Sequence, residues 1–235
     1  MKVRFLGTSS MLLSGVPASY LINNHILIDL PNGNHRILKL NKQVESIDTL
    51  IITHHHADHV FDVPFLLLAK LKEQKSLNIY LSKKNYRKIK KLCKIGFPHL
   101  YKEMFKSKKI KFIYDDEFII DGISINRFKV KHGKMKCAFG YTFKEKNKSI
   151  SFTGDSAYCD NVLDAAVTSD YLVCDATYVF GNDKHMGVND VKFLLNQNGK
   201  LKIYPTHLSE DAKKALKKLH NRRIKFVCDN KEIKI

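Results

Sequence analysis

The sequence of 235 residues has little cysteine, proline or glycine, with five Cys, five Pro and eleven Gly, and it has no tryptophan. So little proline and glycine excludes a collagen-like or low-complexity chain, and 44% hydrophobic residues are enough for a folded core. An odd number of cysteines without a CxxC pair excludes a small disulfide-stapled domain and favours a reducing compartment. We therefore expect one globular domain over residues 1–235, in the cytoplasm.

Long hydrophobic runs are also missing. No apolar stretch approaches the roughly 18 to 20 residues that a helix needs to cross a bilayer. The first residues are too mixed for the apolar segment of a secretory signal. We therefore expect no membrane partner.

Acidic residues are scarce, because 23 Asp and Glu stand against 41 Lys and Arg and give a formal net charge of +18. A polyanionic partner such as nucleic acid is one interpretation of this charge. Only six of the basic residues are arginine, however, the side chain that binds phosphates in a bidentate manner. Lysine-rich sequences also arise from genome-wide base composition, so the total charge leaves both interpretations open.

The first half of the chain alternates short strands with helical segments. Strands are predicted at 3–6, 18–22, 25–29, 50–53 and 78–81, with a hairpin turn at Asn23 and Asn24 between the second and the third. A helix is predicted to start near Pro64, with an apolar run over 65–71. Residues 83–105 are predicted to be a lysine-rich helical region that is broken near Gly96 and Pro98.

From residue 109 the apolar residues recur with a period of two, and later strands and helices alternate again. The first pattern predicts a meander, and so a second sheet, with strands at 111–114, 118–120, 123–131, 138–144 and 149–153. The second pattern predicts helices at 161–168, 188–196 and 209–219 and strands at 171–174, 201–204 and 224–227. Together they predict an α/β protein with two mixed β-sheets that pack on each other and are flanked by helices.

The strongest functional signal is a cluster that directly follows the predicted strand 50–53. It reads His54-x-His56-x-Asp58-His59. Imidazole and carboxylate ligands together suit zinc, manganese or iron. The acidic residue favours a metal site, because an accidental surface histidine tract would usually lack it.

Three further candidates stand at the ends of predicted strands. They are His132, Asp155 and His207. Taken singly, each is better explained as an ordinary loop residue. Taken with the cluster, they supply the additional ligands that a pair of divalent ions requires.

The order of these motifs resembles the metallo-β-lactamase fold superfamily of metallohydrolases, in which HxHxDH is followed by a lone His, a lone Asp and a lone His. The resemblance covers nearly the whole chain and implies an αββα sandwich with two divalent metal ions, zinc or manganese, with iron as a further candidate. It also implies a ligand set: one metal is bound by His54, His56 and His132, the other is bound by Asp58, His59 and His207, and Asp155 bridges the two.

The tail is similar to one branch of that superfamily, the ribonuclease Z and PhnP-like phosphodiesterases. The residues that carry this resemblance are Cys174-Asp175-Ala176-Thr177-Tyr178 and Lys184-His185-Met186-Gly187. It implies that His185 contacts the scissile phosphate and assists proton transfer to the leaving oxygen, with Asp175 orienting the ring. It also implies that Asp58, besides binding metal, holds the metal-bridging hydroxide that attacks phosphorus.

Two departures bear on the substrate. Ribonuclease Z has a long arm for transfer RNA between the lone His and the bridging Asp, whereas only residues 133–154 lie in that interval here. The cysteine-based zinc site of PhnP has no counterpart, because the first fifty residues contain no cysteine. We expect a phosphodiesterase for small, anionic cyclic or nucleotide-like diesters.

Other functions remain open alternatives. They are a ribonuclease Z-like RNA-processing endonuclease without the arm, with RNA as its partner, and a lactone or β-lactam hydrolase. A nucleic-acid-binding module with one structural metal is disfavoured, because such a site needs about four ligands and the chain offers seven. The family resemblance also allows a homodimer.

Several neighbours of these motifs are expected to support the site. Thr53 and His55 flank the ligands and are predicted to orient or pack against them. Lys131 and Lys134 are candidate contacts for a substrate phosphate, with solvated lysines as the alternative. The segment 7–10 resembles the GT(G/S)S loop of the same branch, which lies near the metal edge, and a plain turn is the alternative.

Overall fold

The computed structural model describes residues 1–10 and 15–235. Backbone contacts divide them into two compact units. Unit 1 consists mainly of residues 15–115, together with 1–7 and 229–234, and unit 2 consists mainly of residues 116–228, together with 8–10. Each unit has its own sheet and its own helices, and the single domain expected over 1–235 stays a prediction.

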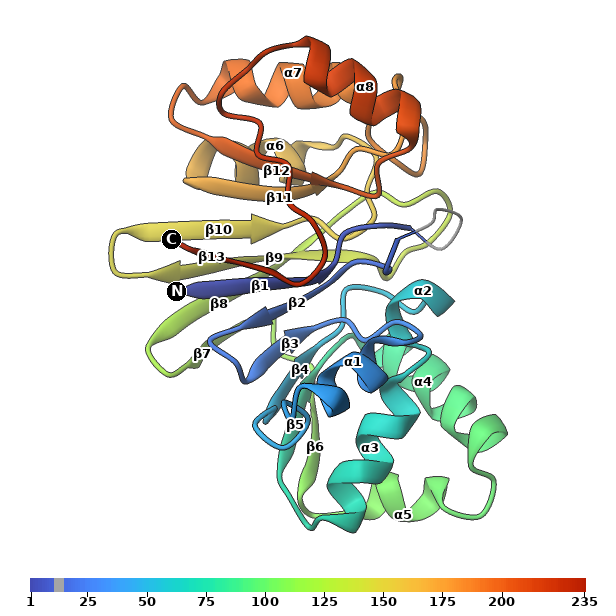
Figure 1. The fold of residues 1–235 in the computed structure, drawn as a ribbon. Coiled ribbons are helices and arrows are strands. Elements are labelled where there is room, and N and C mark those ends of the chain that lie inside the picture. Colours follow the sequence, from blue (N-terminus) through green and yellow to red (C-terminus); the bar gives the residue numbers. More distant parts are fainter. Residues whose placement is uncertain (11–14) are drawn as a thin grey trace. The chain divides into compact units, whose positions relative to one another are not determined.

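The sheet of unit 1 has seven strands in the order β13-β1-β2-β3-β4-β5-β6 (Figure 1). β13, β1, β2 and β3 pair in an antiparallel manner, whereas β3, β4, β5 and β6 run parallel. The strands are β1 (Lys2–Gly7), β2 (Ser19–Ile22), β3 (Ile26–Ile28), β4 (Thr49–Ile51), β5 (Leu77–Tyr80), β6 (Ile110–Ile113) and β13 (Lys231–Lys234).

The predicted hairpin between β2 and β3 is present. Asn23 and Asn24 have φ angles of 47° and 66°, in the left-handed region that a two-residue hairpin turn requires and that asparagine tolerates. The helices of unit 1 connect the parallel strands, and apolar side chains of α3 complete the core with the sheet. They are α1 (Asn34–Leu40), α2 (Ala57–Val60), α3 (Val63–Lys72), α4 (Lys83–Gly96) and α5 (Tyr101–Lys106).

The sheet of unit 2 has six strands in the order β12-β11-β10-β9-β8-β7. β7 to β10 form an antiparallel meander, and β10, β11 and β12 run parallel. The strands are β7 (Glu117–Ile120), β8 (Ile123–Lys129), β9 (Phe139–Glu145), β10 (Lys148–Phe152), β11 (Tyr171–Asp175) and β12 (Lys202–Thr206), and the helices that flank them in Figure 1 are α6 (Asp160–Thr168), α7 (Val188–Gln197) and α8 (Glu210–Lys218).

The predicted fold class, α/β with two mixed sheets flanked by helices, is confirmed, with three corrections. The strand expected to open the second sheet is β6, which instead pairs parallel with β5 in unit 1. Residues 224–227 form no strand, because only Ile224 makes an isolated bridge, to Ile203. The sequence patterns also missed α1 and β13, both of which are short.

The cysteines and the helices bear on the expectations about disulfides and membrane spans. All five cysteines are free thiols. Within the described ranges, no helix is both long enough and apolar enough to cross a membrane.

Candidate metal centre

In unit 1 the histidine cluster occupies the loop that leaves the carboxyl end of β4 and the short helix α2. His54 is fully buried, and its Nε2 lies 3.1 Å from Nδ1 of His56. The ring centroids of His54 and His59 are 4.0 Å apart. The three imidazoles are thus gathered at the end of a parallel strand, the place where open α/β sheets usually bind ligands.

Asp58 and His59 both lie on α2. A carboxylate oxygen of Asp58 and a ring nitrogen of His59 lie within 4.8 Å of each other. His56, the residue just before this helix, has an extended backbone, and α2 begins at Ala57. The backbone therefore changes from loop to helix between His56 and Asp58.

A residue to which sequence reasoning gave no role holds this cluster in place. Asp29 is 1% exposed, and one of its carboxylate oxygens accepts hydrogen bonds from Oγ1 of Thr53, at 2.6 Å, and from Nδ1 of His59, at 2.7 Å. The other oxygen accepts from the backbone amide of Thr53 at 2.8 Å. Because Nδ1 of His59 donates to a carboxylate, its Nε2 carries the lone pair that a metal needs.

A signal for Asp29 was present in the sequence. It follows β3, the strand that pairs with β4, and a carboxylate at one strand end can reach the loop that leaves its neighbour. The prediction that Thr53 supports the cluster agrees with its two hydrogen bonds to Asp29.

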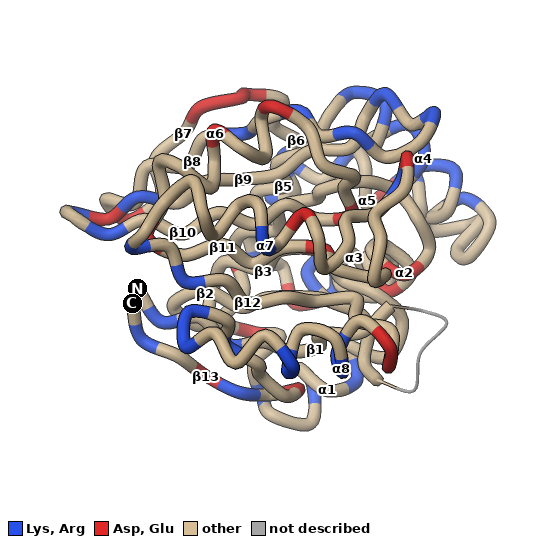
Figure 2. The backbone as a smooth tube through the Cα atoms, turned by 90° about the horizontal axis from the view of Figure 1, so that it is seen from above, with Lys and Arg blue, Asp and Glu red and all other residues tan. Residues whose placement is uncertain are grey.

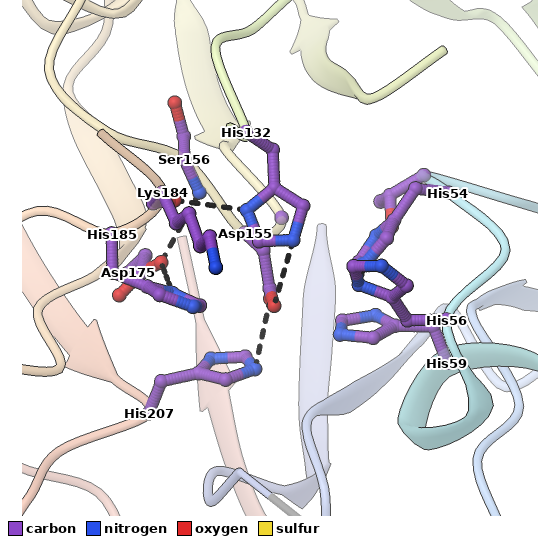
Figure 3. Close-up of polar contacts among 12 residues, drawn as sticks. His54, His56, His59, His132, Asp155, Ser156, Asp175, Lys184, His185 and His207 are labelled. Atoms are coloured by element: carbon purple, nitrogen blue, oxygen red, sulfur yellow. Dashed lines mark hydrogen bonds and ion pairs between the residues drawn. The ribbon is translucent and has the colours of Figure 1, made fainter. Parts of the chain in front are cut away.

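In unit 2 the three strand-end residues come together around one carboxylate (Figure 3). Asp155 is 4% exposed. Its Oδ1 lies 3.0 Å from Nε2 of His207, and its Oδ2 lies 3.9 Å from Nε2 of His132. Residues from the ends of β8, β10 and β12 therefore present two imidazoles to the two oxygens of one acid, the arrangement that a bridging ligand would need.

Backbone groups hold His132 and His207 in place. Nδ1 of His132 donates to the carbonyl oxygen of Lys184 at 2.9 Å, which leaves Nε2 as an acceptor. The backbone amide of His207 donates to the carbonyl oxygen of Thr8 at 2.8 Å. Thr8 belongs to segment 7–10, which resembles the GT(G/S)S loop, so this loop contacts a candidate ligand.

A second histidine–aspartate pair stands beside His132. Nδ1 of His185 lies 2.6 Å from Oδ2 of Asp175, and the rings of His185 and His132 are 5.1 Å apart. Asp175 is fully buried and also accepts hydrogen bonds from the amide of Ser156 and from the amide and hydroxyl of Thr177. A carboxylate held by so many donors is a rigid anchor for the imidazole.

This environment changes the acidity of His185. Burial acts to lower the pKa of its imidazole, but the hydrogen bond and the charge of Asp175 outweigh burial, so the pKa is raised above its ordinary value. With Nδ1 turned to Asp175, Nε2 is the atom left to hold or transfer a proton. The pairing of His185 with Asp175 predicted from the sequence is thus present.

His55 is hydrogen bonded to a residue outside the histidine cluster. Its Nδ1 lies 2.8 Å from Oδ1 of Asn85, a buried residue of α4. Burial lowers the pKa of His55, and the charges of Lys88 and Lys84 lower it further. His55 thus ties the loop to α4, consistent with the supporting role expected for it.

Lysines surround the loop of His132. An open cavity of about 600 Å³ in unit 2 is lined in part by the apolar residues Val130 and Met135. Its other lining residues include Lys129, Lys131, Lys134 and Lys136. The two lysines expected to contact substrate phosphate, Lys131 and Lys134, therefore both line a cavity next to a candidate ligand.

The donor set suits divalent metal ions. Within each unit, buried imidazoles lie close to carboxylate oxygens, and His59 and His132 turn Nδ1 to a protein acceptor, which places the lone pair on Nε2. Imidazole with carboxylate is the combination typical of zinc and manganese sites. All seven residues predicted from the sequence lie in these two groups.

Comparison with known proteins agrees with this geometry. Residues 24–208 match the β-lactamase superfamily domain. A ribonuclease Z from Staphylococcus epidermidis is 28% identical, with 89% of each chain covered. YhfI from Bacillus subtilis, a metallo-β-lactamase fold protein, superposes with a TM-score of 0.79 at 18% identity, covering 99% of this chain and 98% of that one. A diphosphatase from the PhnP family superposes with a TM-score of 0.76 at 18% identity, covering 100% and 97%.

The chain belongs to the metallo-β-lactamase fold superfamily, on its ribonuclease Z and PhnP-like branch. It is a metal-dependent hydrolase. The resemblance noted from the motifs is thereby confirmed, whereas the role of each candidate residue stays a prediction.

Proposed function

We propose that this hydrolase cleaves phosphodiesters, with small cyclic or nucleotide-like diesters as its substrates. The observation that supports this proposal best is the pairing of His185 with the buried Asp175 at 2.6 Å. β-Lactams and lactones offer no phosphate oxygen for such an imidazole. A proton donor beside the candidate ligands suits a reaction that must release an alkoxide.

In this proposal the ligands predicted from the sequence hold two divalent ions. Family membership and the donor chemistry of the two residue groups support this assignment. We assign one ion to His54, His56 and His132 and the other to Asp58, His59 and His207, with Asp155 between them. The ions are zinc or manganese in this proposal, with iron as a further candidate. When bound, such ions supply charge stabilisation of the phosphoryl group and activation of water.

The protein's own residues then complete the reaction. Nε2 of His185, held in place through Nδ1, protonates the leaving oxygen or donates a hydrogen bond to an equatorial phosphate oxygen. Asp58 accepts a hydrogen bond from the attacking water and so fixes its direction. Lys131 and Lys134 attract the anionic substrate, because their charges line the cavity beside His132.

The first test is turnover of bis-p-nitrophenyl phosphate by metal-replete protein, beside a chromogenic β-lactam, a lactone and the dinucleotide TpT. We expect hydrolysis of the phosphodiesters alone. Turnover of the lactam or lactone without phosphodiester turnover would contradict the proposal.

His185→Ala is the corresponding variant. We expect it to lower turnover of TpT by roughly 10²- to 10⁴-fold, because the nucleoside alkoxide needs a proton. The loss with bis-p-nitrophenyl phosphate should be smaller, since nitrophenolate leaves without one. Metal content, measured by elemental analysis, should not change, and His99→Ala, at an exposed histidine of unit 1, is the control. Loss of metal from the His185 variant would show that this residue is a ligand.

A second candidate function is cleavage of RNA. The relatives in sequence named ribonuclease Z favour it, and so does the net charge of +18. The short interval between His132 and Asp155 argues against transfer RNA bound through an arm. Cleavage of a short RNA by the metal-replete protein would support this second function.

We further propose a cytoplasmic location, supported by five free thiols. A homodimer also stays a proposal, and light scattering of the purified protein tests it.

A further inference from the structure

The positive charge of the protein is concentrated in one segment of unit 1. Residues 83–111 contain twelve Lys and Arg and a single acidic residue, Glu103, so these 29 residues hold a net +11. The other 206 residues share the remaining +7. Drift in base composition would spread lysine along the chain, and it does not explain this concentration.

The segment folds into α4, α5 and the start of β6, and in Figure 2 Lys and Arg are dense along α4. The buried residues of α4 are Asn85, Ile89 and Cys93, spaced by four. A helix turns 100° per residue, so the basic residues fall within an arc of about 160° on the other side. We call this arc the α4 basic face: Lys83, Lys84, Arg87, Lys88, Lys90, Lys91 and Lys94, all of which are exposed.

Carboxylates of the described residues do not neutralise this face. Among those residues, none of the seven side chains forms an ion pair with Asp or Glu. Lys83 and Lys90 instead lie over aromatic rings of Tyr114, Tyr86 and Phe105, at 5.7 to 6.0 Å from the ring centroids. Each pair of like charges four residues apart, such as Lys84 with Lys88, destabilises a helix by about 0.2 to 0.5 kcal/mol. A polyanion laid along the helix would remove that repulsion.

The α4 basic face has a direct connection to the candidate metal ligands of the same unit. Asn85, in the first turn of α4, is hydrogen bonded to His55 at 2.8 Å. His55 stands between His54 and His56 in the sequence. A strand bound along α4 would therefore begin one hydrogen bond away from the loop that holds these ligands. The face extends about 16 Å from Lys83 to Lys94 at 1.5 Å per residue, long enough for several phosphates.

We propose that the α4 basic face binds the phosphate backbone of an RNA strand. The inference rests on the proposed function only in that an RNA strand is itself a phosphodiester. The contact is electrostatic and independent of base sequence, and it provides a positively charged surface for RNA in a protein that has no arm between His132 and Asp155.

The test measures binding separately from cleavage. Anisotropy of a fluorescein-labelled 20-nucleotide RNA is titrated with protein in EDTA, so that no metal-dependent hydrolysis occurs, over a series of salt concentrations. The variant combines Lys84→Gln, Lys88→Gln and Lys91→Gln. The control combines Lys214→Gln, Lys217→Gln and Lys218→Gln, which remove the same charge from exposed lysines on or next to the last turn of α8.

We expect the slope of log K against log salt to become shallower by about 2 in the α4 variant, because each phosphate that a lysine no longer neutralises removes roughly 0.7 from the slope. The α8 control should keep the slope of the wild type. Equal slopes for all three proteins, or equal changes in both variants, would overturn the proposal, because overall charge would then suffice.

Turnover of bis-p-nitrophenyl phosphate separates this inference from the proposed function. The α4 variant should hydrolyse this small diester at the wild-type rate. If the wild type fails to hydrolyse bis-p-nitrophenyl phosphate but the α4 variant shows the shallower salt slope, the proposed function is contradicted and the RNA-binding proposal is supported. If the wild type hydrolyses bis-p-nitrophenyl phosphate but the salt slopes of the three proteins are equal, the RNA-binding proposal is contradicted and the proposed function is supported. A second RNA of unrelated sequence should bind with the same affinity, and a strong preference for one sequence would contradict a backbone contact.

Discussion

Lys70 is a cation enclosed by the core of unit 1. It lies on α3 with 1% of its surface exposed, and its Nζ donates to the carbonyl oxygens of Val44 and Glu45 at 2.8 and 3.1 Å. Burial lowers its pKa from the ordinary lysine value, because the charged form loses hydration. The side chain therefore fixes the segment before β4 and also makes stability depend on pH.

We predict that Lys70→Met, which keeps most of the apolar body, lowers the free energy of unfolding by roughly 1 to 3 kcal/mol, because the buried carbonyl of Val44 and the partly buried carbonyl of Glu45 lose their donor. The measurement is urea unfolding at neutral pH. Lys72→Met, at an exposed position of the same helix, should change little. An unchanged Lys70 variant would mean that water replaces the ammonium group.

The pH dependence has a definite sign. Since the folded pKa of Lys70 is lower than the unfolded one, the unfolded chain binds more protons between the two values. The free energy of unfolding of the wild type should therefore rise with pH from the folded pKa of Lys70 up to about 10.5. The Lys70→Met variant should lack this contribution, so the difference in stability between wild type and variant should widen over that range.

At the scale of single elements, Gly140 on β9 shows how tightly the sheet of unit 2 is packed. It pairs with Phe128 on β8. A Cβ at this position would overlap the Phe128 ring and would lie 2.8 Å from the carbonyl oxygen of Phe152 on β10. The glycine is required because an aromatic ring covers the strand there.

We predict that Gly140→Ala destabilises the protein by roughly 1 to 3 kcal/mol, the usual cost of overpacking. Gly199→Ala is the matched control, because no atom lies within 4 Å of its Cβ position. Thermal or urea unfolding of the two variants gives the comparison. Equal stabilities would show that the Phe128 ring moves aside without cost.

Elements with a clear period were predictable from the sequence, and those defined by distant partners were not. The alternation over 123–131 and 138–144 corresponds to β8 and β9, which pair with each other. β6 was assigned to the wrong sheet, because a local pattern cannot show which strand will be the neighbour. β13 was missed, because its four residues, Lys231–Lys234, depend on pairing with β1 rather than on their own propensity.

The same distinction applies to the site. Residue type and spacing were enough to single out the cluster from His54 to His59 and the three strand-end candidate ligands, which the structure gathers in two groups. The role of Asp29 was not found, because its importance comes from contacts with Thr53 and His59, 24 and 30 residues away. Asn85 was missed in the same way.

At the scale of the whole molecule, the proposed ions link metal content to stability. A ligand that binds only the folded state stabilises it by about 2.7 kcal/mol at one hundred times its dissociation constant. We predict that Asp155→Ala, which removes the acid between His132 and His207, lowers zinc or manganese content towards zero. It should also abolish the rise in melting temperature that added metal causes in the wild type.

Elemental analysis and thermal unfolding with and without metal check this prediction. Asp164→Ala, at an exposed acid of the same unit, should behave as the wild type does. Retention of both ions by the Asp155 variant would rule out a bridging role.

The pairing of β13 with β1 has a consequence for synthesis. β1 is made more than two hundred residues before β13, so one of its edges has no partner until residues 231–234 follow. On the ribosome, this open strand edge is a place where another nascent chain can add a strand. Lys2, an exposed lysine, lies on β1, and lysine at a strand edge discourages such pairing. The order of synthesis thus gives Lys2 a protective role during folding, because it lies on the edge that waits for β13.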